Sequence, residues 1–233
     1  MRAALRVPAV LMTVVIGAAG AASCGGNSPG TAASDLPKAA ASSPGPSGAR
    51  TAPRAAELPK HAVAGDKRPG FGAADTMAEG YTGKDFLTGL SKDWKLKLDG
   101  PVEQEMPDGG KRTYVNGRGG DGVTVSAGYA DHRNLSSLLC RAGADRSGDF
   151  GFLAACTGLD VAGVDHGKAS AWLRQARKET DALYARKVAE TGNKKEYVVS
   201  GVFTSGPVTM VLHRAYDRYS LRILGGAVAS GGQ

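Results

Sequence analysis

The chain has 233 residues, of which 42% are hydrophobic and 22% charged, with a formal net charge of +7. Its Lys and Arg residues form no run interleaved with aromatic side chains, which argues against the basic face of a nucleic-acid-binding protein. After the N-terminal stretches described below are set aside, about 155 residues remain, enough for one domain but too few for a two-lobed solute-binding protein.

The first residues have the layout of a secretory signal peptide. Arg2 and Arg6 supply a positive start, residues 7–22 are uncharged, and the run ends in small residues just before Cys24. The apolar run is shorter than the roughly 20 residues of a membrane-spanning helix. We therefore predict that residues 1–23 are removed after export, rather than kept as a permanent span.

The end of this stretch, Ala21-Ala22-Ser23-Cys24, resembles the lipobox of bacterial lipoproteins, and the composition is similar to that of actinobacterial-type lipoproteins. The resemblance implies a diacylglyceryl group on the Cys24 sulfur, cleavage just before Cys24, and anchoring by acyl chains at the outer face of the cytoplasmic membrane. Ala21 stands where the lipobox most often has leucine. The alternative is ordinary signal-peptidase cleavage after Ala21.

The cysteine count agrees with lipidation. The chain has three cysteines, and an odd number in an exported protein needs an explanation. Lipidation of Cys24 leaves Cys140 and Cys156, which we expect to form a disulfide outside the cytoplasm. Two free buried thiols are the alternative.

Residues 24–78 are predicted to form a disordered tether. Ala, Gly, Pro and Ser dominate there, and Phe71 is the only aromatic residue. Such a composition cannot bury enough apolar surface to offset the entropy of ordering the chain. The folded domain is accordingly expected to span residues 79–233.

Within that domain, apolar periodicity alternates between helix and strand spacing. Helices are predicted over residues 82–93, 134–140, 149–159 and 167–191, and strands over residues 94–98, 111–116, 123–129 and, in a meander, 197–223. This order predicts an α+β fold, with one curved antiparallel sheet of about five or six strands and one long and several short helices packed on one face.

No catalytic or metal-binding pattern stands out in the folded part. None of the four histidines lies three or four residues from another His or Cys, so metal-ligand spacing is absent. The nucleophile motifs G-x-S-x-G and S-x-x-K do not occur there. Gly117 to Gly122 precede strand residues, unlike a phosphate-binding loop. We predict no catalytic residue, no metal and no cofactor.

Aromatic residues of the predicted strands are the candidate binding surface, because several on the uncovered sheet face would form one. The candidates are Tyr114, Tyr129, Tyr197, Tyr219 and His213. The leading hypothesis is a non-enzymatic, membrane-anchored lipoprotein that binds a small ligand or a cell-wall or protein partner, and no nucleic acid. The alternatives are an envelope hydrolase with an unrecognised active site and a purely structural surface protein.

Overall fold

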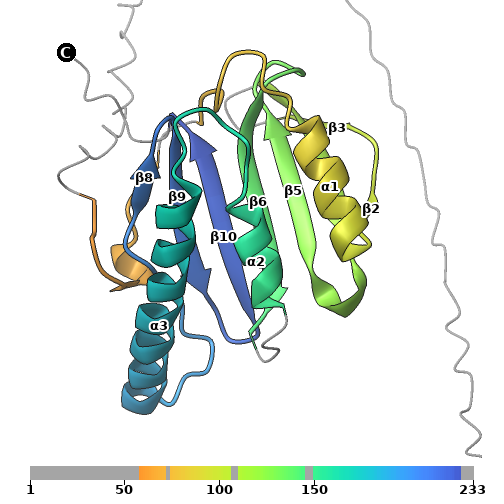
Figure 1. Ribbon diagram of the computed structural model, residues 1–233. Coiled ribbons are helices and arrows are strands. Elements are labelled where there is room, and N and C mark those ends of the chain that lie inside the picture. The colour runs from red at the N-terminus through yellow and green to blue at the C-terminus, as the bar shows by residue number, and fades with distance from the viewer. Residues whose placement is uncertain (1–57, 72–73, 106–109, 145–148, 227–233) are drawn as a thin grey trace, which may run out of the picture. The chain divides into compact units, whose positions relative to one another are not determined.

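The computed structural model describes residues 58–71, 74–105, 110–144 and 149–226. The fold is α+β, as the sequence predicts: an antiparallel sheet carries three helices on one face (Figure 1). The predicted signal peptide, the lipobox-like sequence with Cys24 and residues 24–57 of the predicted tether lie outside the described residues. No helix in the described ranges is long and apolar enough to cross a membrane.

The described part of the sheet has ten strands, where the sequence predicts five or six. The strands are β1 Val63–Ala64, β2 Lys97–Leu98, β3 Val102–Glu105, β4 Lys111–Arg118, β5 Thr124–Tyr129, β6 Leu135–Gly143, β7 Val198–Val199, β8 Phe203–Ser205, β9 Val208–Arg214 and β10 Arg218–Gly225. Their order is β1-β7-β9-β10-β6-β5-β4-β2. The number of strands is higher than predicted because pairs of short strands share one neighbouring strand. β2 and β3 both pair with β4, and β7 and β8 both pair with β9.

The helices are α1 Lys84–Trp94, α2 Phe150–Cys156 and α3 His166–Thr191, and short 3-10 turns cover Gly65–Lys67 and Gly120–Gly122. The long helix α3 agrees with its predicted range. The Asp165 carboxylate accepts a hydrogen bond from the Lys168 amide at 2.9 Å at its start. At its end Gly192 adopts a left-handed conformation (φ 67°), which glycine tolerates without steric cost.

The helix predicted to begin at Asn134 is wrong, because Leu135–Gly143 forms the central strand β6. It pairs with β5 on one side and β10 on the other. A register shift between Gly128 and Tyr129 of β5 lets Leu135 and Leu138 both reach the core, although three residues separate them. The same spacing occurs on one face of a helix, so the sequence pattern alone does not distinguish a helix from this strand. The pairing of β6 at both of its edges does.

The fold begins before residue 79, where the predicted domain starts. β1 pairs with β7, Asp75 forms a β-bridge with Gly225, and Met77 is fully buried. The absence of a Cβ at Gly201 allows this close packing, since a Cβ there would lie 2.2 Å from the Lys60 carbonyl oxygen. The composition does not predict that this segment is folded, because backbone hydrogen bonds hold most of it. Such bonds leave no apolar pattern in the sequence.

A polar cluster holds α3 against the sheet beside the apolar core. The Asp181 carboxylate accepts hydrogen bonds from Arg214 Nε at 3.1 Å and from the Tyr219 hydroxyl. The Arg214 guanidinium lies 4.4 Å from the Tyr184 ring centroid. Arg177 completes the cluster with its Nε 3.7 Å from Asp181 and its guanidinium over Phe150. The residues of this cluster thus serve helix packing.

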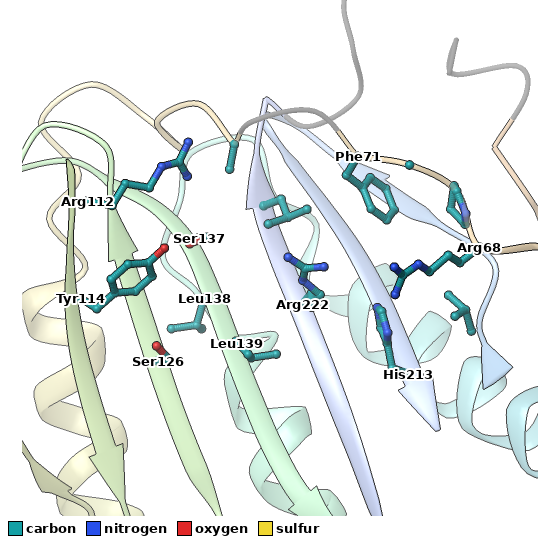
Figure 2. Close-up of a pocket in the computed structure, with 15 residues that line it drawn as sticks. Arg68, Phe71, Arg112, Tyr114, Ser126, Ser137, Leu138, Leu139, His213 and Arg222 are labelled. Carbon is teal, nitrogen blue, oxygen red and sulfur yellow. The ribbon is translucent and has the colours of Figure 1, made fainter. Parts of the chain in front are cut away.

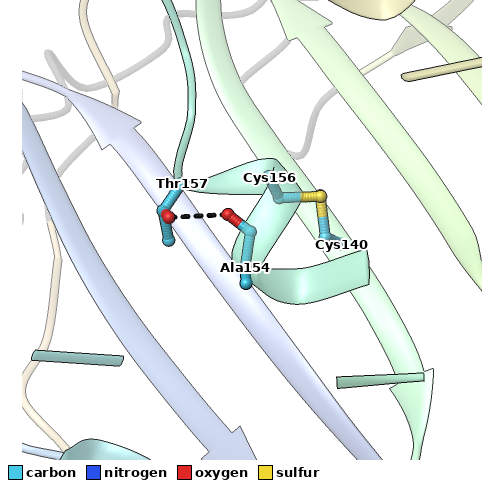
Figure 3. The surroundings of a disulfide bond; sticks show 4 residues. All are labelled: Cys140, Ala154, Cys156 and Thr157. Carbon is cyan, nitrogen blue, oxygen red and sulfur yellow. Dashed lines mark hydrogen bonds between the residues drawn. A yellow bond between two sulfur atoms is a disulfide. The ribbon is translucent and has the colours of Figure 1, made fainter. Parts of the chain in front are cut away.

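A disulfide joins the sheet to α2 (Figure 3). Cys140 of β6 and Cys156 at the end of α2 are bonded, and both are fully buried. This pairing confirms the expected disulfide. The Thr157 hydroxyl donates a hydrogen bond to the Ala154 carbonyl at 2.7 Å and stabilises the helix end next to the bridge.

Reducing the Cys140–Cys156 bridge should lower the free energy of unfolding by about 3 kcal/mol, because the cross-link restricts the unfolded chain. Urea unfolding followed by circular dichroism, with and without reductant, measures the change. A Cys140→Ala/Cys156→Ala double variant should not respond to reductant. An unchanged wild-type midpoint, together with two thiols alkylated before any reduction, would contradict the prediction.

Candidate ligand-binding pocket

The sheet face opposite the helices carries the residues that alternate with the core positions. Along one cross-strand row, Ser126 of β5 pairs with Leu139 of β6, which pairs with Arg222 of β10. Core residues lie one position away: Cys140 of β6 pairs with Leu221 of β10. Strand alternation thus separates a disulfide-linked core face from an open face with polar side chains.

A pocket of about 670 Å³ lies on this open face (Figure 2). One wall is the chain segment around Arg68 and Phe71, which follows β1. The floor and the other walls come from β4, β5, β6, β9 and β10. The polar side chains that line the pocket are Arg68, Arg112, Tyr114, Ser126, Ser137, His213 and Arg222. Apolar contacts come from residues that include Phe71, Leu139, Val199 and Leu224.

His213 is the most buried ionisable group of the pocket, with only 8% of its surface exposed. Its Nδ1 contacts the Tyr197 hydroxyl, whereas its Nε2 is buried and has no hydrogen-bond partner among the described residues. Burial, followed by the positive charges of Arg222 and Arg68, lowers the pKa of His213 to about 4. The imidazole is therefore neutral at pH 7, with one polar atom unsatisfied.

Arg222 lies in the middle of the pocket on β10 and keeps contact with solvent. Partial desolvation by the pocket walls, together with the charges of Arg68 and Arg141, lowers the pKa of its guanidinium. It remains charged at neutral pH, since an arginine pKa is far above 7. None of the described residues that line the pocket is acidic. The pocket is thus a positively charged site.

The structure brings two of the five candidate residues, Tyr114 and His213, together in this pocket. Tyr197 precedes β7 and contacts His213. Tyr129 and Tyr219 lie on the helix-covered face, with 9% and 2% exposure. Since Tyr114 pairs with Gly128, the next residue Tyr129 faces the opposite side. The four tyrosines therefore do not share one sheet face.

Sequence reasoning did not select the three arginines of the pocket. Arg222 could have been found, because it occupies a polar position between two core residues of a strand, whereas Arg112 lies between exposed Lys111 and buried Thr113. Arg68 and Phe71 could not, since they lie in a segment whose composition predicts a tether. Only the pairing of β1 with β7 brings that segment to the sheet.

Among the described residues, the contacts of His132 are not those of a catalytic triad. His132 Nδ1 lies 2.5 Å from the Thr113 hydroxyl and 3.7 Å from a Glu103 carboxylate oxygen. Both partners approach the same ring nitrogen, whereas a catalytic triad uses the two nitrogens separately. In the described part of the chain, no three His, Cys, Asp or Glu residues gather in a metal-binding group.

Compared with protein-family models, curated proteins and solved structures, the chain gives no match in any of the three. The function proposed below therefore rests on the geometry of the pocket and on the N-terminal sequence.

Acidification should destabilise the domain through His213. Its folded pKa of about 4 lies below the ordinary histidine value of 6.5, so the folded state binds fewer protons between these values. The stability contribution is complete above about pH 6.5 and is lost as the pH falls toward 4, by on the order of 3 kcal/mol. Urea unfolding at pH 7, 6, 5 and 4.5 measures this slope.

A His213→Gln variant, which is neutral throughout this range, is the matched control and should show a smaller loss. Asp131, Asp165 and Asp217 have pKa values lowered below 3.8, so their contributions change at lower pH. If the free energy of unfolding falls equally with pH in the wild type and the variant, His213 is not the source of the loss of stability.

Proposed function

We propose that this protein is a lipid-anchored extracytoplasmic lipoprotein whose domain binds a small ligand in the open-face pocket, without catalysis. The observation that carries the proposal is the pocket itself, about 670 Å³ in volume with mixed apolar and polar walls. This volume falls in the range of sites that hold small molecules. The buried, unpaired Nε2 of His213 adds a polar group that a ligand can satisfy.

Binding agrees with the chemistry of His213 better than hydrolysis does. A general base for reaction near neutral pH needs a pKa near 7, whereas the pKa of His213 is about 4. The hydroxyl in contact with its ring belongs to Tyr197, and among the described residues no carboxylate contacts the imidazole. The described residues of the pocket therefore include no base suited to activating Ser126 or Ser137.

Anchoring through Cys24 would hold this pocket at the membrane surface. The lipobox-like sequence supports the anchor, and Arg68 and Phe71 link the N-terminal part of the chain to the pocket wall. Two or more acyl chains on one residue give stable membrane attachment, which a single chain does not. The anchor and the binding site are thus two separable parts of the proposal.

The Cys24→Ser variant should lose its lipid, because the thiol is the acylation site in the proposed class. We expect the protein either in the medium or unprocessed, and no incorporation of labelled palmitate. Cell fractionation and autoradiography measure both effects, with Ser23→Ala as the matched control that keeps the thiol. Labelling, processing and membrane retention equal to the wild type would disprove the anchor.

Filling the pocket should remove the ligand without unfolding the domain. In Ser126→Trp, the indole enters the pocket from β5; in Thr124→Trp, it lies two residues along the same strand face, outside the pocket lining. Mass spectrometry of small molecules extracted from protein purified from its own membranes should show a compound in the wild type and the Thr124 variant only. A wild-type protein without any such compound would contradict ligand binding.

A further inference from the structure

The three pocket arginines come from separate parts of the chain: Arg68 follows β1, Arg112 lies on β4 and Arg222 on β10. In the described residues none of the three forms an ion pair, in contrast to four arginines elsewhere on the domain. Those four are Arg177, Arg186, Arg214 and Arg218, each beside an Asp or Glu carboxylate. The pocket thus concentrates positive charge that the described chain leaves without a counter-charge.

This arrangement has a free-energy cost that a bound anion would remove. Arg68 is close enough to Arg222 and His213 that its charge lowers the pKa of both. In the tautomer in which the Tyr197 hydroxyl donates to Nδ1, Nε2 of the neutral imidazole carries the proton and is a donor. Two guanidinium groups and one N–H group are the donors that recognise a phosphate or carboxylate.

Another part of the pocket lining is apolar. Phe71 packs on Ala74 and Leu224 in a small hydrophobic cluster, separate from the main core. Leu139 of β6 lies next to Arg222 in the sheet register, and Figure 2 shows its side chain beneath the arginine. An inorganic anion would leave these apolar surfaces in contact with water, whereas an anion with a hydrocarbon part would cover them.

We propose that the pocket binds an anionic amphiphile, with its oxyanion at Arg68, Arg222 and His213 and its hydrocarbon part against Phe71, Leu139 and Leu224. This inference rests on the proposed function and specifies its ligand. Both a lipid headgroup and a soluble anion with a short chain have this chemistry, and the experiment below distinguishes them.

Calorimetry on the full mature chain, held in nanodiscs of zwitterionic phosphatidylcholine, tests the inference with matched probes. Hexyl phosphate carries both parts, inorganic phosphate only the oxyanion and hexanol only the chain. Hexyl phosphate should bind at least about tenfold more tightly than either of the other two, because each part adds on the order of one decade in affinity. Dihexanoyl phosphatidylglycerol is tested below its critical micelle concentration. If it binds more tightly than hexyl phosphate, the native ligand is a lipid rather than a soluble anion.

Charge removal within the pocket gives the second test. Arg222→Met and Arg68→Met should each weaken hexyl phosphate binding at least about tenfold, since a charge-assisted contact is lost. Arg118→Met removes the same charge from exposed β4, outside the pocket lining, and should leave the affinity unchanged. Unfolding temperatures of all three variants without ligand should stay near the wild-type value, since none of these arginines forms an ion pair within the described residues.

Several results would overturn the inference and leave the proposed function intact. Hexanol binding as tightly as hexyl phosphate, or extraction of an uncharged compound that Ser126→Trp excludes, would show a neutral ligand. Equal weakening by Arg118→Met and Arg222→Met would show attraction to the overall charge rather than a site. Absence of binding by every probe, with the native compound still excluded by Ser126→Trp, would also reject an anionic amphiphile. A different result would contradict the proposed function itself, namely that the wild-type protein carries no bound compound.

Discussion

The pairing of β6 with β10 is the interaction on which the remaining structure depends. These strands are far apart in the chain, and their register from Arg218–Gly143 to Leu224–Ser137 joins the β5-β4-β2 side of the sheet to the β9-β7-β1 side. One face of the pair carries Cys140 and Leu221 under the helices. The other carries Leu139 and Arg222, so one register sets both the core and the pocket floor.

The two faces are stabilised by different means. On the helix side, apolar packing, the buried disulfide and the hydrogen bonds of Asp181 hold α2 and α3 to the sheet. On the open side, the chain around Arg68 and Phe71 covers only part of the face, held through β1 and β7. A pocket is left where this cover ends, and within the described residues its three arginines form no ion pair, whereas Arg177 and Arg214 on the helix side do.

The charge distribution of the pocket supports the proposed binding of a ligand. His213 stays neutral because its burial, followed by the charges of Arg222 and Arg68, disfavours its protonation, so the positive charge of the pocket at neutral pH comes from guanidinium groups. Such a site exerts a steady attraction on an oxyanion and provides no base for chemistry near pH 7. Its walls add apolar surface, which favours a ligand with two chemically distinct parts. An anchor at Cys24 would keep that ligand site near the membrane from which an amphiphile could be drawn.

Local pattern by itself determined much of this protein: the α+β class, the range of α3, the strands β4, β5, β9 and β10, and the Cys140–Cys156 pairing. These follow from periodicity and composition, which act over a few residues. Tertiary structure alone decided that Leu135–Gly143 is a strand, that residues before 79 join the sheet, and that Tyr114 and Tyr129 face opposite sides. It also gathered Arg68, Arg112 and Arg222. The reason is that register and cross-strand neighbours depend on hydrogen bonds between distant segments, which leave no periodic trace in the sequence.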